Sequence, residues 1–189
     1  MLLATASFVN CVGGTNGDNP TEIARSDVDA IIATLQGNNA EFLSEMIEGE
    51  NKFGTGPVRD AYFAMGSTSL IGQLENVQGF IAKAQYPDTK NTLPSEWGTI
   101  SNVRFFLSSR ASVTPTASLL GADIYNIFVT GQEAYTTIEL NGATAQFIYH
   151  PPGWGDDPCE LRQTCGYRFA YATTITNDAW VFNVRTTLA

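Results

Sequence analysis

The last stretch of the chain, Cys165-Gly-Tyr-Arg-Phe-Ala-Tyr-Ala-Thr-Thr-Ile-Thr-Asn-Asp-Ala-Trp-Val-Phe-Asn-Val-Arg-Thr-Thr-Leu-Ala189, decides the fold class. Aromatic or apolar residues occupy every second position in two parts of it: Tyr167, Phe169 and Tyr171, then Trp180, Phe182 and Val184. Alternation with a period of two is typical of strands that bury one face. We therefore expect two half-buried strands here, and an end of the chain that is tied into the fold.

The first half of the chain predicts two helices. Ser26 is the expected N-cap of an amphipathic helix over Asp27 to Gln36, because apolar residues recur there on one face. Between Ser67 and Gln85 the apolar residues again recur every three or four positions, which indicates a second helix. Pro87 closes that segment, since proline cannot continue a helix.

Beyond residue 93 the apolar pattern changes to a period of two. Strands are expected in four further segments: Trp97 to Ser101, Val103 to Leu107, Asp123 to Thr130 and Thr144 to Tyr149. The fold class is therefore α+β, with helices early and strands late. We expect one compact unit with a flexible connector over 1–25, a helix-containing part over 26–92 and a β-rich part over 93–189.

The composition limits the function classes. Only 15% of the residues are charged, well below the roughly 25% of average proteins, and such charge depletion is compatible with extensive burial against other subunits. A net charge of −9 disfavours tight nucleic-acid binding, which depends on a basic face. No window reaches the roughly 20 apolar residues of a membrane span, and no signal peptide begins the chain, so we expect a soluble protein without a membrane partner.

Few residues suggest chemistry. His150 is the only histidine, and with Cys159 and Cys165 it lacks metal-ligand spacing, so we predict no metal site. Three carboxylates follow Trp154: Asp156, Asp157 and Glu160. Two of them beside an aromatic ring could form the acid pair of a glycosidase, but the sequence Gly-Trp-Gly-Asp-Asp-Pro favours a solvated turn. The Gly13 to Gly17 segment lacks the strand and lysine of a phosphate-binding loop. We predict no catalytic residue and no cofactor.

Five motifs occur in a fixed order along the chain: Leu35-Gln-Gly-Asn-Asn-Ala40, the segment Ala61 to Tyr86, Glu96-Trp-Gly-Thr-Ile-Ser-Asn-Val-Arg104, Ile127-Phe-Val-Thr-Gly-Gln-Glu-Ala-Tyr135 and Asn177-Asp-Ala-Trp180. Together they resemble the C-terminal half of tailed-bacteriophage major capsid proteins, in the short-tailed-phage coat-protein branch of the Hong Kong type shell fold. The resemblance extends from about Ser26 to Ala189. It implies an axial β-rich lobe with peripheral helices.

The resemblance also singles out eight positions for folding and assembly: Glu96, Gly98, Asn102, Arg104, Gly131, Tyr135, Asp178 and Trp180. The first acid and the arginine of its motif are expected to pair. Asn102 stands where the family usually has glycine, and asparagine tolerates a positive φ there. The family's N-terminal arm, extended loop and spine helix have no counterpart before Ser26, so we expect either a fragment of a longer protein or a reduced version of the family, with the fragment favoured.

The function implied by the resemblance is structural and not enzymatic. The chain is expected to assemble with itself into pentamers and hexamers of an icosahedral phage head that encloses double-stranded DNA without sequence-specific binding. Scaffolding, portal and cement proteins are the further implied partners, and the location is the virion capsid, assembled in the host cytoplasm. The alternative is a secreted or virion-surface carbohydrate-binding β domain, with Tyr149, Trp154 and Asp156 as the sugar platform.

Overall fold

A computed structural model describes residues 7–11, 19–43, 60–86, 92–93, 95–116, 121–139, 146–155, 159 and 161–188. The chain divides into two compact units. The first combines Met1–Ala134 with Ile175–Ala189, and the second is Tyr135–Thr174. The expectation of one compact unit is therefore wrong, because the second unit interrupts the β-rich part of the first.

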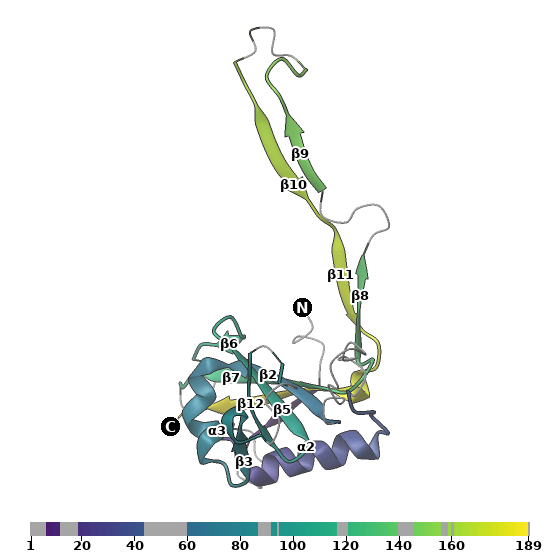
Figure 1. Cartoon of the computed structure of the whole chain (residues 1–189). Coiled ribbons are helices and arrows are strands. Elements are labelled where there is room, and N and C mark those ends of the chain that lie inside the picture. Colours follow the sequence, from purple (N-terminus) through teal and green to yellow (C-terminus); the bar gives the residue numbers. More distant parts are fainter. Residues whose placement is uncertain are drawn as a thin grey trace. The chain divides into compact units, whose positions relative to one another are not determined.

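Within the described residues, the first unit is built on an eight-stranded sheet with the order β1-β12-β7-β2-β5-β4-β3, and β6 lies beside β7 (Figure 1). The strands are β1 (Ser7–Asn10), β2 (Tyr62–Ser67), β3 (Phe80–Ala82), β4 (Glu96–Ile100), β5 (Val103–Ser108), β6 (Val113–Thr114), β7 (Ile124–Thr130) and β12 (Val181–Thr187). The pairs β1–β12 and β2–β5 are parallel, and the other pairs are antiparallel. The mixed α+β class is confirmed.

The first predicted helix is present as α2 (Arg25–Gly37). Its N-cap is Ala24 and not Ser26, because the carboxylate of Asp27 accepts a hydrogen bond of 2.9 Å from the backbone N–H of Ala24. The helix ends before Asn39, whose φ of 55° is a left-handed conformation that asparagine tolerates.

The second predicted helix is mostly absent. Only η1 (Thr68–Leu70) and α3 (Ile71–Asn76) are helical at its start, and the segment continues as β3 and the short turn η2 (Lys83–Gln85). Gly79 adopts a φ of 86°, which no α-helix contains, and Phe80 then pairs with Ile100. The apolar residues recur with a helical period, but they belong first to a short helix and then to a strand, so the period does not mark one continuous helix.

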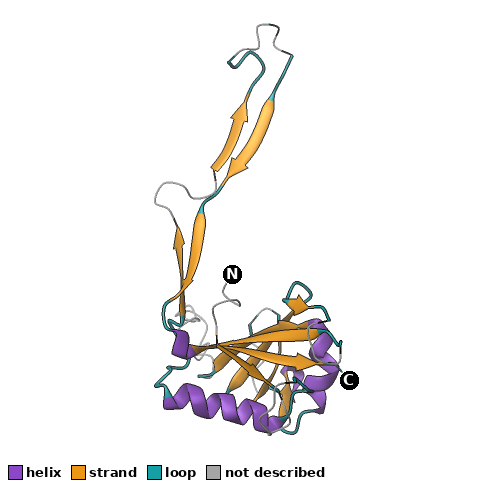
Figure 2. Ribbon diagram, turned by 180° about the vertical axis from the view of Figure 1, so that it is seen from behind, coloured by secondary structure: helices purple, strands orange, loops and turns teal. Residues whose placement is uncertain are grey.

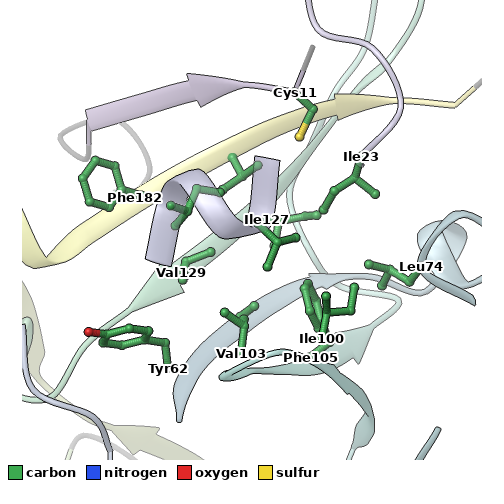
Figure 3. Packing of buried hydrophobic residues seen from close by; sticks show 14 of the residues in the cluster. Cys11, Ile23, Tyr62, Leu74, Ile100, Val103, Phe105, Ile127, Val129 and Phe182 are labelled. Atoms are coloured by element: carbon green, nitrogen blue, oxygen red, sulfur yellow. The ribbon is translucent and has the colours of Figure 1, made fainter. Parts of the chain in front are cut away.

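The core lies between α2 and one face of the sheet (Figures 1 and 3). Buried residues from both layers form one cluster that includes Val28, Ile31, Leu35, Val103, Phe105, Ile127, Val129 and Val184. Tyr62 is also buried in this cluster, and its hydroxyl donates a hydrogen bond of 2.9 Å to the carbonyl oxygen of Ala40. That bond holds the end of α2 on the sheet.

The predicted flexible connector over 1–25 is wrong for its described residues. Strand β1 pairs with β12, and the N–H of Cys11 donates to the carbonyl oxygen of Arg185 at 2.9 Å. The side chain of Cys11 is fully buried, and this burial raises the pKa of its thiol above the ordinary range. Further along, the N–H of Thr187 donates to the carbonyl oxygen of Thr21, so both parts are fixed to the last strand.

The second unit consists of two strand pairs (Figure 2). Strand β8 (Tyr135–Glu139) lies beside β11 (Tyr171–Ile175), and β9 (Gln146–His150) pairs antiparallel with β10 (Thr164–Arg168). The expected half-buried strand through Tyr167 is wrong, because this side chain is 76% exposed and the strand is broken after Arg168. None of the helices in the described ranges is long and apolar enough to cross a membrane.

Substitution of Leu35 by alanine tests the packing of α2. The Leu35 side chain is completely buried, so we expect the free energy of unfolding to fall by about 3 kcal/mol through lost burial and a residual cavity. Urea denaturation measures this loss. Gln36→Ala, at an exposed position of the same helix, is the control and should change the stability by less than about 0.5 kcal/mol.

Candidate functional site

The eight residues singled out by sequence lie in three kinds of place. Four belong to the hairpin of β4 and β5: Glu96, Gly98, Asn102 and Arg104. Gly131 and Trp180 meet near the C-terminal end of α2. Tyr135 and Asp178 are exposed and lie outside both groups. Tyr135 is the first residue of the second unit, and Asp178 lies in the turn η4 (Asp178–Trp180).

Glu96 and Arg104 form a buried ion pair, as expected from their motif. The Arg104 Nε–H donates to Oε1 of Glu96 at 2.8 Å, and a second guanidinium N–H donates to Oε2. The hydroxyl of Tyr86 donates to Oε1 at 2.9 Å, and the backbone N–H of Leu93 donates to Oε2 at 3.0 Å. Each carboxylate oxygen therefore accepts two hydrogen bonds, which is what a buried charge requires.

A β-bulge in β4 directs Glu96 toward Arg104. Gly98 pairs with Phe105, but Glu96 pairs with Phe106, so Trp97 is the extra residue. In a regular strand Glu96 would share a face with Gly98, because side chains alternate. The extra residue reverses that alternation and places Glu96 on the face that carries Arg104.

The surroundings of Glu96 keep it ionised. Burial by itself would raise the pKa of Glu96, but the hydrogen bonds from Arg104, Leu93 and Tyr86 outweigh it and leave the pKa below the ordinary value. Burial and the adjacent carboxylate raise the pKa of Tyr86 to about 12, so its hydroxyl stays a hydrogen-bond donor at neutral pH. A carboxylate held in this way stabilises structure and is poorly suited to exchange protons as a general acid or base.

Gly98 allows close contact between β4 and the edge strand β3. A Cβ atom at this position would lie 2.6 Å from the carbonyl oxygen of Ile81 and from Cε2 of Phe80, so any side chain would push β3 away. At the other end of the hairpin, the residue with positive φ is Ser101, at 54°, and not Asn102. The asparagine thus does not replace glycine in the way its motif suggested, although the two-residue turn is present.

Trp180 joins α2 to the sheet. Its indole N–H donates to the carbonyl oxygen of Asn38 at 2.9 Å, and the Asn38 side-chain amide donates back to the carbonyl oxygen of Ala179 at 3.0 Å. The N–H of Gly131 donates to the carbonyl oxygen of Trp180, and a Cβ atom on Gly131 would lie 3.2 Å from the carbonyl oxygen of Glu41. Trp180 stands in η4 and not in the strand predicted for it.

The alternative sites receive little support. In the described part of the chain, no group of three or more His, Cys, Asp and Glu residues could hold a metal ion. The acidic residues Asp156, Asp157 and Glu160 and the Gly13 to Gly17 segment lie outside the described residues. A groove of about 800 Å³ beside β4 is lined mainly by apolar side chains. Glu96 is among its lining residues, but its carboxylate forms an ion pair with Arg104.

The proposed sugar platform is not assembled. The Trp154 ring stacks on the ring of His150, with centroids 5.1 Å apart and an interplanar angle of 21°. His150 follows Tyr149 directly in β9, so the two side chains project from opposite faces of the strand. Trp154 and Tyr149 therefore belong to different faces.

Sequence reasoning missed several contributors to these clusters, notably Phe80, Tyr86, Leu93 and Asn38. Tyr86 directly follows the segment predicted as a helix to Gln85, and that prediction gives its hydroxyl no partner in β4. Leu93 donates through its backbone N–H, and Asn38 accepts from Trp180 through its backbone carbonyl, so the residue type gives no signal for either role. The side-chain amide of Asn38 also donates to the carbonyl oxygen of Ala179, a partner distant in sequence. Phe80 could have been found only by pairing β3 with β4 in the correct register.

Substitution of Glu96 by glutamine tests the buried pair. Loss of the charge leaves Arg104 buried without its counter-ion, so we expect a destabilisation of about 3 kcal/mol at pH 7 in urea denaturation. Because the folded-state pKa of Glu96 is depressed, its contribution is present above the ordinary value of 4.5 and is lost as the pH falls through the folded-state pKa. The difference from wild type should therefore shrink in acid. A difference that is the same at every pH would contradict the ionic origin, and the exposed Glu22→Gln is the control.

Substitution of Gly98 by alanine tests the contact with β3. The added methyl group cannot be accommodated against a backbone carbonyl, so we expect a loss of about 3 kcal/mol in the free energy of unfolding. Gly72→Ala is the matched control, because no atom lies within 4 Å of its Cβ position in α3, and alanine is the better helix former. Equal stabilities for the two variants would contradict the prediction, because β3 would then shift at no cost to make room for the methyl group.

No known family model and no curated protein matches the sequence. Three solved structures of phage shells match the fold. The capsid of Ralstonia phage GP4 has a TM-score of 0.58 at 14% identity, over 98% of this chain and 53% of that chain. The acidic stable capsid of Helicobacter pylori bacteriophage KHP30 has a TM-score of 0.55 at 12% identity, over 97% and 61%. The head of Helicobacter pylori bacteriophage KHP40 has a TM-score of 0.54 at 12% identity, over 94% and 62%.

These similarities cover nearly the whole of this chain, including both compact units. The chain spans only about half to three fifths of the length of the chains that it matches. At such low identity the comparison concerns the fold and not particular residues. The fold of this chain is thus a mixed α+β fold that also occurs in the shells of bacteriophages.

Proposed function

We propose that this chain is a structural subunit of a phage head. The observation that carries the proposal is the similarity of the fold to three phage shell structures over 94% to 98% of the chain. The buried cluster around Glu96 supports it, because its polar groups are bound to one another and hold a hairpin in shape. A structural subunit needs such rigid internal connections and no reactive group.

The finer proposal is a major capsid protein of the Hong Kong type, represented by its C-terminal half, that forms pentamers and hexamers of an icosahedral head around double-stranded DNA. The order of the five sequence motifs supports this assignment. A closed symmetric shell is held together by many interfaces between identical subunits. A low content of charged residues favours such burial, because interface cores are depleted of charge. Scaffolding, portal and cement proteins remain proposed partners, with assembly in the host cytoplasm.

The eight motif residues have two proposed roles in such a subunit. The buried pair, Gly98, Gly131 and Trp180 fix the shape of the lobe that neighbours must recognise. Tyr135 and Asp178 are exposed, so their proposed role is in contacts with neighbouring subunits. Asn102 shapes the hairpin turn next to Ser101.

Electron microscopy and sedimentation of the gene product that carries these residues test the proposed function. We expect closed shells, or regular pentamers and hexamers, since shell subunits associate through repeated symmetric contacts. Gly72→Ala, which alters an open surface position of α3, should assemble like wild type. A product that stays monomeric at all concentrations and binds glycans on an array would contradict the proposal.

A further inference from the structure

One face of the β9–β10 pair is aromatic. Residues directly opposite each other in an antiparallel pair project from the same face, and Phe147 lies opposite Tyr167 while Tyr149 lies opposite Cys165. Phe169 continues this face, because its ring stacks on that of Tyr167 with centroids 6.1 Å apart and an interplanar angle of 6°. We call these four aromatic side chains together with Cys165 the aromatic face.

The opposite face of the same pair has a different character. It carries Gln146, Ile148, His150, Thr164, Gly166 and Arg168. The Arg168 guanidinium donates a hydrogen bond of 2.9 Å to the side-chain oxygen of Gln146, so polar groups pair with each other across this face. The opposite face also carries Ile148, and Trp154 stacks on its His150, so the two faces differ in that four aromatic side chains of the strand pair and its continuation lie together on the aromatic face.

The aromatic face is exposed within the described part of the second unit. Phe147 is 74% exposed, Tyr149 is 52%, Tyr167 is 76% and Phe169 is 55%. With about 200 Å² for a whole aromatic side chain, the four expose roughly 500 Å², which is as large as the largest apolar patch on a typical monomer. An isolated two-stranded pair is marginally stable in water and needs an apolar face packed on something. Nothing in the described part of the second unit provides that cover.

We propose that the aromatic face packs against a second copy of this chain. The proposal rests on the proposed function and names the surface that a neighbouring subunit covers. A standard protein interface buries about 800 Å² on each partner, of which somewhat more than half is apolar. The roughly 500 Å² of the aromatic face matches that apolar share. In a closed shell the same contact is repeated between identical subunits, so the aromatic face of each subunit would be covered by the same surface of a neighbour.

The double variant Phe147→Ser with Tyr167→Ser tests this contact in the gene product. Aromatic residues at the centre of an interface carry most of its binding energy, so we expect self-association measured by sedimentation velocity to weaken at least about 100-fold. Ile148→Ser is the matched control, since it removes an apolar side chain of β9 from the opposite face, and it should associate nearly like wild type. The thermal unfolding of the first unit should be the same in all three proteins, because the changes lie in the second unit.

Alkylation of Cys165 gives a second readout that does not depend on a variant. Its thiol is exposed on the aromatic face of the single chain, so it should react in dilute, dissociated protein and be protected at least tenfold in the assembled protein, as read by mass spectrometry. Protection that is already complete in the dissociated subunit would overturn the proposal, since the cover would then come from the same polypeptide.

The outcomes separate this proposal from the proposed function. Shells that form equally well from the double variant, with Cys165 reactive throughout, overturn the packing of the aromatic face on a second copy and leave the shell function intact. A wild-type product that never associates overturns both. Glycan binding that is lost in the double variant would instead assign the aromatic face to a carbohydrate.

Discussion

The buried ion pair between Glu96 and Arg104 is the constraint on which this side of the fold depends. Two opposite charges that are buried away from water are tolerated only when their remaining donors and acceptors also form hydrogen bonds. The carboxylate of Glu96 accepts such bonds from Arg104, from the hydroxyl of Tyr86 and from the backbone N–H of Leu93. Tyr86 and Leu93 belong to the segment between β3 and β4. The pair therefore connects Tyr86 and Leu93 to the hairpin, next to the bulge at Trp97 that sets its register.

The last strand plays the corresponding role on the other side of the sheet. Strand β12 lies between β1 and β7, so the N-terminal strand joins the sheet only through it. Trp180 stands immediately before β12 and connects it to the end of α2 through Asn38. Because the second unit is inserted between β7 and β12, it leaves and re-enters the first unit where Gly131 and Trp180 are hydrogen-bonded.

The apolar patterns of the sequence were sufficient to predict the α+β class, α2 and the core strands, because each of these leaves a local periodicity. The Glu96–Arg104 pair was an expectation from the resemblance of its motif to the capsid family. The sequence did not predict the bulge. A strict alternation of period two assumes that every residue is paired, so it does not allow for Trp97 as an extra residue. The segment from Ser67 to Gln85 failed for another reason. A short helix and a strand in succession mimic a single helical period, and only Gly79 indicated the break.

The alternation from Tyr167 onward is the most instructive error. Alternation reports that one face of a strand is to be buried, but it does not report what buries it, and we assumed the sheet of the same chain. In the first unit that assumption holds, because α2 covers the apolar face. In the second unit the same pattern belongs to a strand pair whose aromatic residues are more than half exposed. The alternation therefore predicts a buried face that the described part of the second unit does not cover. This is the surface that we propose a second copy of the chain covers, and the low charge of the chain is compatible with such burial.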